Sequence, residues 1–269
     1  MASRKWSSFF PLVLALAGAL GLAADVPPGP VGWWKFDEAS GVVAADSSGS
    51  GNNGTAIGAA CFADDPDLGR VLEIAALSGE VVIPRSAALE PAHGTVEVWV
   101  RPDGKQTAEI VQMLTDEYPR SGTYGGEYYV YMLRVVNTGQ MFGTIINDDP
   151  AEKYRWINLY SSGGLVKWGE WNQLALRWDG SALALFVNGR LVAATPYLEI
   201  PGSGLSYSGE FPLVVAAHRD ANPDLEYTGR ISDLRVYNRP LSEDEIAAHY
   251  NEKATFIAHS RSVKGRKLY

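Results

Sequence analysis

Residues 181–195, with the sequence SALALFVNGRLVAAT, place Asn188 and Gly189 between two apolar arms. Asn-Gly is the pair that most readily takes positive φ angles at both centres of a tight two-residue turn. Such a turn joins two neighbouring antiparallel strands. The stretch therefore predicts a β-hairpin, and it restricts the chain to folds that contain antiparallel sheet.

Strand-like patterns recur along the rest of the chain. In residues 95–101, TVEVWVR, three valines alternate with Glu97, Trp99 and Arg101, which is the two-residue period of a half-buried strand. Residues 172–178, NQLALRW, repeat the pattern. About ten or more such runs are separated by Gly, Pro, Asn and Asp. We therefore predict an all-β fold of two packed antiparallel sheets.

One helix is legible near the end of the chain. In residues 241–250, LSEDEIAAHY, Ser242 precedes Glu245 by three residues, the spacing of a capping box that satisfies the first amide groups of a helix. Residues 251–269 turn basic and lose the helical period. We predict one short C-terminal helix, followed by a mobile basic tail over 251–269 with a weak tendency to contact an acidic surface.

The first 24 residues have the order of a secretory signal peptide. Arg4 and Lys5 precede an uncharged apolar run, and small residues follow it up to Ala24. The run is shorter than the roughly 18 to 20 apolar residues that span a bilayer, so an uncleaved anchor is the weaker alternative. We predict a secreted, extracytoplasmic chain whose mature form begins near Asp25.

Charge and cysteine content narrow the possible functions. The formal net charge is −8, so nucleic acid is an unfavourable partner for the surface. Cys61 is the single cysteine and has no partner for an internal disulfide. Stability must then come from a core, and residues 25–250 are sufficient for one all-β domain.

Four blocks of sequence carry a family resemblance. They are GWWKFDEASGVVAADSSGSGNNGT, GTVEVWVRP, WNQLALRWDGSALALFVNGRLVA and GRISDLRVYNRPLSEDEI, in this order. Together they resemble the laminin-G-like branch of the concanavalin A-like lectin and glucanase jelly rolls, from about Val31 to Tyr250. The resemblance implies a jelly-roll sandwich of two curved antiparallel sheets. It does not select a function, because this fold carries lectins, glycan-cleaving enzymes and adhesion modules alike.

The acidic residues do not form the pattern of a glycosidase. Glucanases of this fold carry Glu, Asp and Glu at alternating or near-alternating positions of one strand, and no segment here has that pattern. Glu97 is the one acid inside a clearly predicted strand, and its neighbours on the same face are Trp99 and Arg101. We expect no catalysis, with a divergent glycoside hydrolase as the alternative.

Aromatic residues gather between residues 118 and 168. Flat rings beside polar side chains are typical of sugar-binding surfaces. We assign Trp156 and Trp168, with Tyr128 next, to ligand binding, and Trp171 and Trp178 to the core. The expected partner is a polysaccharide or glycoconjugate. The alternative is a surface protein, since laminin-G-like domains also serve adhesion.

Residues 45–55, ADSSGSGNNGT, form an oxygen-rich loop. Jelly rolls of the family often bind one structural Ca²⁺ between the first and last strands, which implies Asp46 and Asp233 as ligands here. Relatives often have an aspartate one position earlier, where this chain has Ser232. A tight turn without metal is the alternative. Asn53 also begins a formal N-glycosylation sequon.

Overall fold

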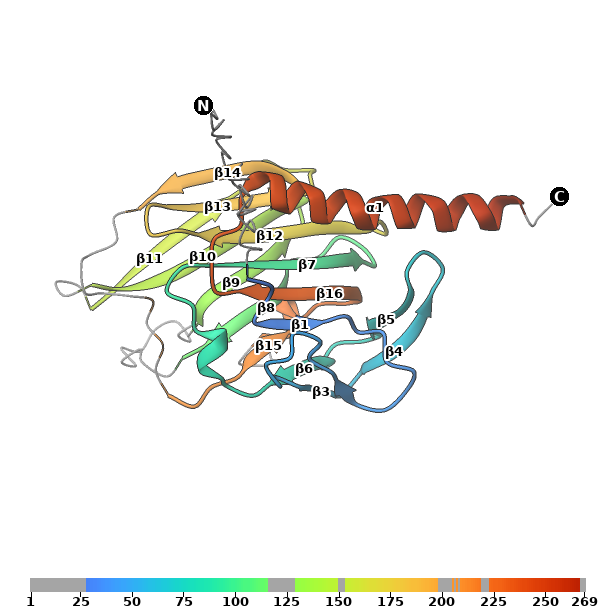
Figure 1. The fold of residues 1–269 in the computed structure, drawn as a ribbon, viewed down its shortest axis with the longest axis horizontal. Helices are drawn as coiled ribbons and strands as arrows, with labels where there is room; N and C mark the ends of the chain where they lie inside the picture. The colour runs from blue at the N-terminus through green and yellow to red at the C-terminus, as the bar shows by residue number, and fades with distance from the viewer. Residues whose placement is uncertain are drawn as a thin grey trace, which may run out of the picture.

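The computed structural model describes residues 28–115, 129–149, 153–197, 205, 207, 209–218 and 223–266. The predicted signal peptide lies outside these residues, and so does Tyr128. Within them, the chain forms two antiparallel sheets of eight strands each and one α-helix (Figure 1). The all-β jelly-roll prediction is confirmed.

Sheet A has the strand order β14-β13-β12-β7-β16-β5-β4, and β1 also pairs with β16. Its strands are β1 (Gly32–Trp34), β4 (Ala60–Asp65), β5 (Gly69–Ile74), β7 (Gly94–Pro102), β12 (Asn172–Trp178), β13 (Ala182–Val187), β14 (Arg190–Pro196) and β16 (Gly229–Tyr237).

Sheet B has the strand order β11-β10-β9-β8-β15-β6-β3-β2. Its strands are β2 (Val43–Ala44), β3 (Gly54–Ile57), β6 (Glu80–Ile83), β8 (Ala108–Leu114), β9 (Tyr129–Val136), β10 (Gln140–Asp149), β11 (Lys153–Tyr160) and β15 (Leu213–Val215). Two short 3₁₀ helices connect strands, Ala87–Leu89 and Pro223–Leu225.

The core lies between the inner faces of the two sheets. Trp34 and Trp178 are fully buried there, and the ring of Trp178 stacks on Tyr131 with centroids 5.2 Å apart. Trp178 comes from sheet A and Tyr131 from sheet B, so this pair joins the two layers. Trp178 therefore has the core position that the sequence predicts.

The predicted hairpin is β13–β14. Val187 pairs with Arg190 across the turn, and Asn188 and Gly189 have φ angles of 53° and 74°. A Cβ added to Gly189 would lie 2.9 Å from the Cβ of Tyr250. Glycine is therefore required both by the backbone conformation and by the approach of the C-terminal helix.

The C-terminal helix, α1 (Glu243–Arg266), is much longer than predicted. It begins with the expected capping box, because the Glu245 amide donates to Ser242 Oγ and the Ser242 amide donates to the Glu245 carboxylate. Hydrogen bonds from Arg239 and from Ser242 lower the pKa of Glu245 to about 2. The prediction of a non-helical tail after Tyr250 is wrong, since the helix continues to Arg266.

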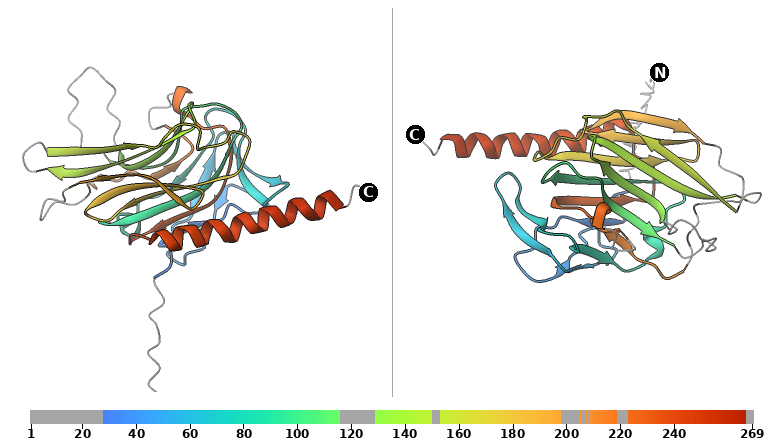
Figure 2. Two further views of the ribbon diagram at one scale, coloured as in Figure 1. Left: turned by 90° about the horizontal axis from the view of Figure 1, so that it is seen from above. Right: turned by 180° about the vertical axis from the view of Figure 1, so that it is seen from behind.

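Helix α1 lies along the outer face of sheet A, on the side of the sandwich opposite β9, β10 and β11 (Figure 2). Ile257 is buried against Trp99 and Trp171, and Arg261 forms two hydrogen bonds to Asp67. Because α1 covers the outer face of sheet A, strand β7, which was predicted to be half-buried, is buried on both faces. It also places Trp171 in an outer cluster under the helix rather than between the sheets.

Candidate functional site

Strand β11 is an edge strand of sheet B and presents a row of polar and aromatic side chains. Ile157 and Leu159 pack on the core between the sheets, so Trp156, Asn158 and Tyr160 point to the outer face. Trp156 is half-buried, and Tyr160 is 55% exposed. The two rings are four positions apart in sequence, which corresponds to about 13 Å along the strand.

The neighbouring strands continue this outer face. Tyr160 lies opposite Phe142 of β10, with ring centroids 4.5 Å apart, and Asn158 accepts a hydrogen bond of 2.7 Å from Thr144. The rings of Trp156 and of Tyr129 on β9 form a T-shaped pair with centroids 5.3 Å apart. The face thus combines rings with amide and hydroxyl groups, the combination that sugars require.

Further into the sheet, the outer face becomes ionic. Arg134 of β9 pairs with the fully buried side chain of Glu109 on β8, and its guanidinium lies 5.6 Å from the Phe142 ring. His218 approaches the same carboxylate at 3.9 Å. The sequence does not predict this cluster, because Glu109, Arg134 and His218 are distant from one another along the chain.

The predicted ligand residues do not form one site. Trp156 belongs to the outer cluster with Tyr129 and Phe142, whereas Trp168 follows β11 in a loop and packs against the main core. Tyr128 lies outside the described residues. Sequence reasoning missed Tyr160, although it has the same parity as Trp156 on one strand, which is the signal that links them.

Asp46 closes the loop that follows β1. Its Oδ1 accepts hydrogen bonds from the amides of Trp33 and Ser48 at 3.0 and 2.8 Å, and Oδ2 accepts from Asn52 at 2.9 Å. Burial alone would raise the pKa of Asp46, but these hydrogen bonds outweigh it and lower the pKa. The side chain of Asn53 in turn accepts from the Asp46 amide, and Asn53 is exposed. This is the geometry of a turn held by its aspartate.

Asp233 faces helix α1 because β16 has a bulge. The pairing of β16 with β7 shifts between Ser232 and Arg235, and Asp233 has a φ of 55°. Strict alternation would place Ser232 and Asp233 on opposite faces, whereas the extra residue lets both point outward toward Lys253.

The residues predicted to bind calcium do not fit that ion. Asp233 accepts from the Trp33 indole at 2.6 Å and from Arg235 at 3.0 and 2.9 Å, and the oxygens of Asp46 face amide hydrogens. Both carboxylates are thus directed at N–H donors rather than at a shared position. Within the described ranges, no group of three or more His, Cys, Asp and Glu side chains is arranged to hold a metal ion.

Glu97 is buried between β7 and helix α1. Its carboxylate contacts His249 Nδ1 at 2.8 Å and accepts from the Gln173 side chain at 3.1 Å. Burial raises the pKa of Glu97, against the opposing effect of His249. Arg101, its neighbour on the same strand face, pairs with Asp65 instead. The side chain of Glu97 is 3% exposed, so it has little access to a bound sugar.

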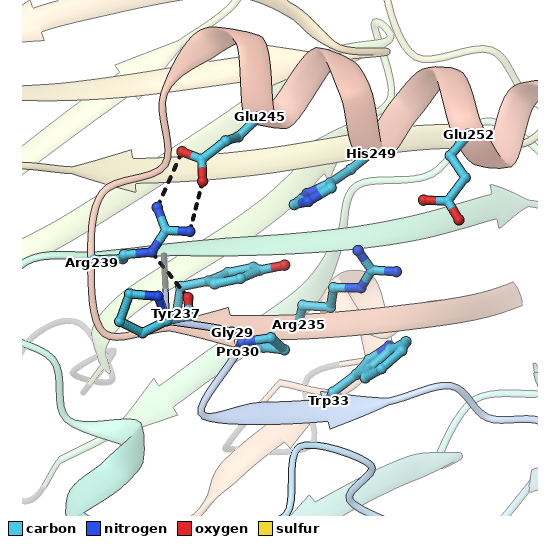
Figure 3. A pocket seen from close by; sticks show the side chains of 10 residues that line it. Gly29, Pro30, Trp33, Arg235, Tyr237, Arg239, Glu245, His249 and Glu252 are labelled. Atoms are coloured by element: carbon cyan, nitrogen blue, oxygen red, sulfur yellow. Dashed lines mark hydrogen bonds and ion pairs between the residues drawn. The ribbon is translucent and has the colours of Figure 1, made fainter. Parts of the chain in front are cut away.

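A groove runs between helix α1 and strands β1 and β16 (Figure 3). One cavity in it has a volume of about 430 Å³, and an adjoining cavity has about 550 Å³. The two cavities share Arg235, His249 and Glu252. The groove is on sheet A, and the aromatic face of β11 is on sheet B, so the molecule has two separate candidate surfaces.

The fold and the exposed aromatic face define a lectin-like β-sandwich domain. A family model described as the concanavalin A-like lectin/glucanases superfamily matches residues 76–247. The chain therefore belongs to this superfamily, as its four sequence blocks indicate. No helix among the described residues is both long enough and apolar enough to cross a membrane.

Comparisons with individual proteins agree on the fold. The chain is 24% identical over 132 residues to pentraxin-related protein PTX3 of Mus musculus, and the match covers 47% of this chain and 33% of that protein. The chain thus spans about a third of this relative.

Three solved structures are similar at low sequence identity. Trypanosoma rangeli sialidase in complex with sialic acid has a TM-score of 0.62 at 15% identity, covering 87% of this chain and 34% of that one. The binding domain of Paraclostridial Mosquitocidal Protein 1 scores 0.59 at 14%, covering 83% and 52%. Domain 4 of AbnA, a GH43 extracellular arabinanase from Geobacillus stearothermophilus, in complex with arabinotriose, scores 0.56 at 15%, covering 82% and 97%.

Proposed function

We propose that this chain binds a polysaccharide or glycoconjugate on the outer face of sheet B and does not cleave it. The observation that carries the proposal is the row of Trp156, Asn158 and Tyr160 on the edge strand β11. A pyranose presents an apolar face to a ring and hydroxyl groups to an amide, and this row supplies both. Structural likeness to a domain solved with arabinotriose supports the class of ligand.

The absence of cleavage rests on the positions of the acids. A glycosidase needs two carboxyl groups about 5 to 9.5 Å apart across the scissile bond. On the outer face of sheet B, Glu109 is held by Arg134, and the side chains of β11 from Arg155 to Tyr160 include no acid. Glu80 is also on this face, but it lies on β6, five strands away from β11. Glu97 lies on the other sheet, beneath α1.

Affinity electrophoresis through gels that contain arabinan, xylan or mixed-linkage glucan tests the proposal. Tyr160→Ala removes an exposed ring and should weaken binding about five- to thirtyfold, which corresponds to about 1–2 kcal/mol. Trp156→Ala should weaken binding about five- to hundredfold. Since Trp156 also packs on Tyr129, we expect this second variant to lose some thermal stability as well.

Phe256→Ala provides the matched control. Phe256 is 54% exposed, nearly the same as Tyr160, but it lies on α1 at the opposite side of the sandwich. Its loss should leave the retardation in the gels unchanged. Equal weakening by Phe256→Ala and Tyr160→Ala, or no retardation of the wild type in any gel, would contradict the proposal. Release of reducing sugar that Glu97→Gln abolishes would return the chain to the enzyme class.

A protein-contact module is the second candidate, and one observation favours it. At the other edge of sheet B, strands β2 and β3 expose Val43 and Ile57, which are 52% and 45% accessible. Exposed apolar side chains at a sheet edge are typical of protein-binding surfaces. Ile57→Ser should then abolish binding to a surface protein and leave polysaccharide binding intact.

We also propose that the mature chain acts outside the cytoplasm and begins near Asp25. The apolar run before Ala24 supports this proposal. Amino-terminal sequencing of the exported protein should give Asp25 or a neighbouring residue. Recovery of intact Met1 in the cytoplasmic fraction would contradict it.

A further inference from the structure

The accessible part of the proposed sugar-binding face is one strand wide. On β11, Asn158 and Tyr160 are exposed and Trp156 is half-buried. The three residues opposite them on β10 are each at most 5% exposed: Ile146, Thr144 and Phe142. A ligand on this face therefore contacts side chains along the edge strand and does not extend across the sheet onto β10.

The two aromatic rings lie at the two ends of this row. Their positions are about 13 Å apart along the strand, whereas a ring in contact with another ring has its centroid within about 7 Å. A single sugar unit, which is similar in size to an aromatic ring, thus reaches Trp156 or Tyr160 but not both. Each ring is also held by a neighbour, since Tyr160 packs on Phe142 and Trp156 on Tyr129. A ligand that contacts both rings needs several linked sugar units.

Asn158 supplies a polar contact midway between the rings. Its Oδ1 accepts a hydrogen bond of 2.7 Å from the hydroxyl group of Thr144, which is fully buried. This bond fixes the amide and leaves Nδ2 as a donor on an exposed side chain. A hydroxyl or ether oxygen of a sugar unit between the two rings can accept from Nδ2. The row thus offers a ring, a donor and a second ring in a line.

Within the described residues, the outer side of the row carries no free charge. Arg155 is the one charged side chain in this part of β11, and the alternation of the strand places it on the opposite side from Trp156. Further into the sheet, Arg134 is paired with Glu109. Residues 116–128 and 148–152, which adjoin these strands in sequence, contain more acids than bases. An acidic polysaccharide would therefore meet no free cation on the row, and the net charge of −8 would repel it.

Given the polysaccharide site proposed above, on which this depends, we infer that its ligand is a linear stretch of a neutral polysaccharide that lies along β11. Several linked units contact Trp156, Asn158 and Tyr160 together. Mono- and disaccharides reach one ring only, and Trp156 is the larger of the two rings. The site thereby selects for chain length and against acidic sugars.

Isothermal titration calorimetry of the full chain with a series of oligosaccharides tests the length of the site. The probes are the di- to hexasaccharides of arabinan, xylan or mixed-linkage glucan, whichever polysaccharide retards the protein in gels. We expect the hexasaccharide to bind about five- to thirtyfold more tightly than the disaccharide, because only the longer chain covers the ring of Tyr160 as well. A gel that contains polygalacturonate tests the charge, and it should not retard the protein.

Tyr160→Ala separates the second ring from the statistical advantage of a long chain. A hexasaccharide has more ways than a disaccharide to place one unit on Trp156, and this gain remains in the variant. Tyr160→Ala should therefore weaken the hexasaccharide about five- to thirtyfold and leave the disaccharide unchanged. Phe256→Ala removes a ring of nearly equal exposure on α1 and should keep the full dependence on length.

Three results would overturn the inference and leave the polysaccharide site intact. They are a hexasaccharide that binds no more tightly than the disaccharide, an equal loss of both in Tyr160→Ala, and retardation by polygalacturonate as strong as by the neutral gels. Absence of binding to every polysaccharide would contradict the site itself together with the inference. The two failures are thereby distinguished.

Discussion

Replacing Asp65 by alanine should lower the free energy of unfolding by about 3–4 kcal/mol. The side chain of Asp65 is fully buried, and its carboxylate pairs with Arg101 at 2.9 Å and with Arg230 at 2.8 Å. It also accepts from the Trp171 indole at 3.3 Å. Removing it leaves two partly buried guanidinium groups without their shared anion, which costs more than the loss of an exposed ion pair. Urea denaturation measures the change.

Asp64→Ala is the control for this prediction. Asp64 is the neighbouring residue on β4, its side chain is 88% exposed, and it pairs only loosely with Arg70 at 3.3 Å. Its loss should change the free energy of unfolding by less than about 1 kcal/mol. If the two variants lose equal stability, the ion pairs of Asp65 with Arg101 and Arg230 do not hold the β4–β5 hairpin on sheet A.

The effect of Asp65→Ala should also depend on pH. Burial raises the pKa of Asp65, but hydrogen bonds from Arg230 and from the amides of Asp67 and Leu68 outweigh it and lower the pKa below its ordinary value of 3.8. A lowered pKa stabilises the folded state above that value, and the stabilisation is lost as the pH falls below it. The difference between wild type and variant should therefore shrink below about pH 4.

A stop codon after Tyr250 should cost about 4–6 kcal/mol and lower Tm by roughly 8–20 °C. The truncation removes Ile257, which is 7% exposed, and the ion pair of Lys253 with the buried Asp233. It also opens Trp99 and Trp171 to water. Differential scanning calorimetry measures the shift.

A stop codon after Arg266 is the matched control, because it leaves the described helix whole. Its Tm should equal that of the full chain within about 1 °C. A truncation after Tyr250 that melts like this control would mean that residues 251–266 do not stabilise the sandwich.

Local patterns predicted much of the fold. Asn188-Gly189 located a hairpin, Ser242 and Glu245 located the start of a helix, and Trp178 lies in the core. Each of these signals depends on residues within a few positions of one another. The family blocks then indicated the sandwich, which local signals alone leave open.

The remaining features depend on contacts that are distant in sequence. Ile246, Tyr250, Ala254 and Ile257 do follow a helical spacing, but the polar residues between them and the basic residues after Ile257 hid it. Arg261 is stabilised by Asp67, 194 residues away, and no local rule pairs them. The bulge that turns Asp233 toward α1 is likewise set by pairing with β7. The aromatic composition of the segment indicated Trp156 as a ligand residue. That Tyr160 lies on the same face became visible only from the register of β11.

Hydrogen exchange with and without saturating arabinan, xylan or mixed-linkage glucan, whichever retards the protein in gels, tests the central claim most directly. Strand β11 is a sheet edge, so a ligand on its outer face should slow the exchange of its amides. We predict slower exchange in residues 153–160 and in the adjoining part of β10, with no change in α1. Slower exchange confined to α1, or none on β11, would contradict the assignment of the polysaccharide site to the outer face of sheet B.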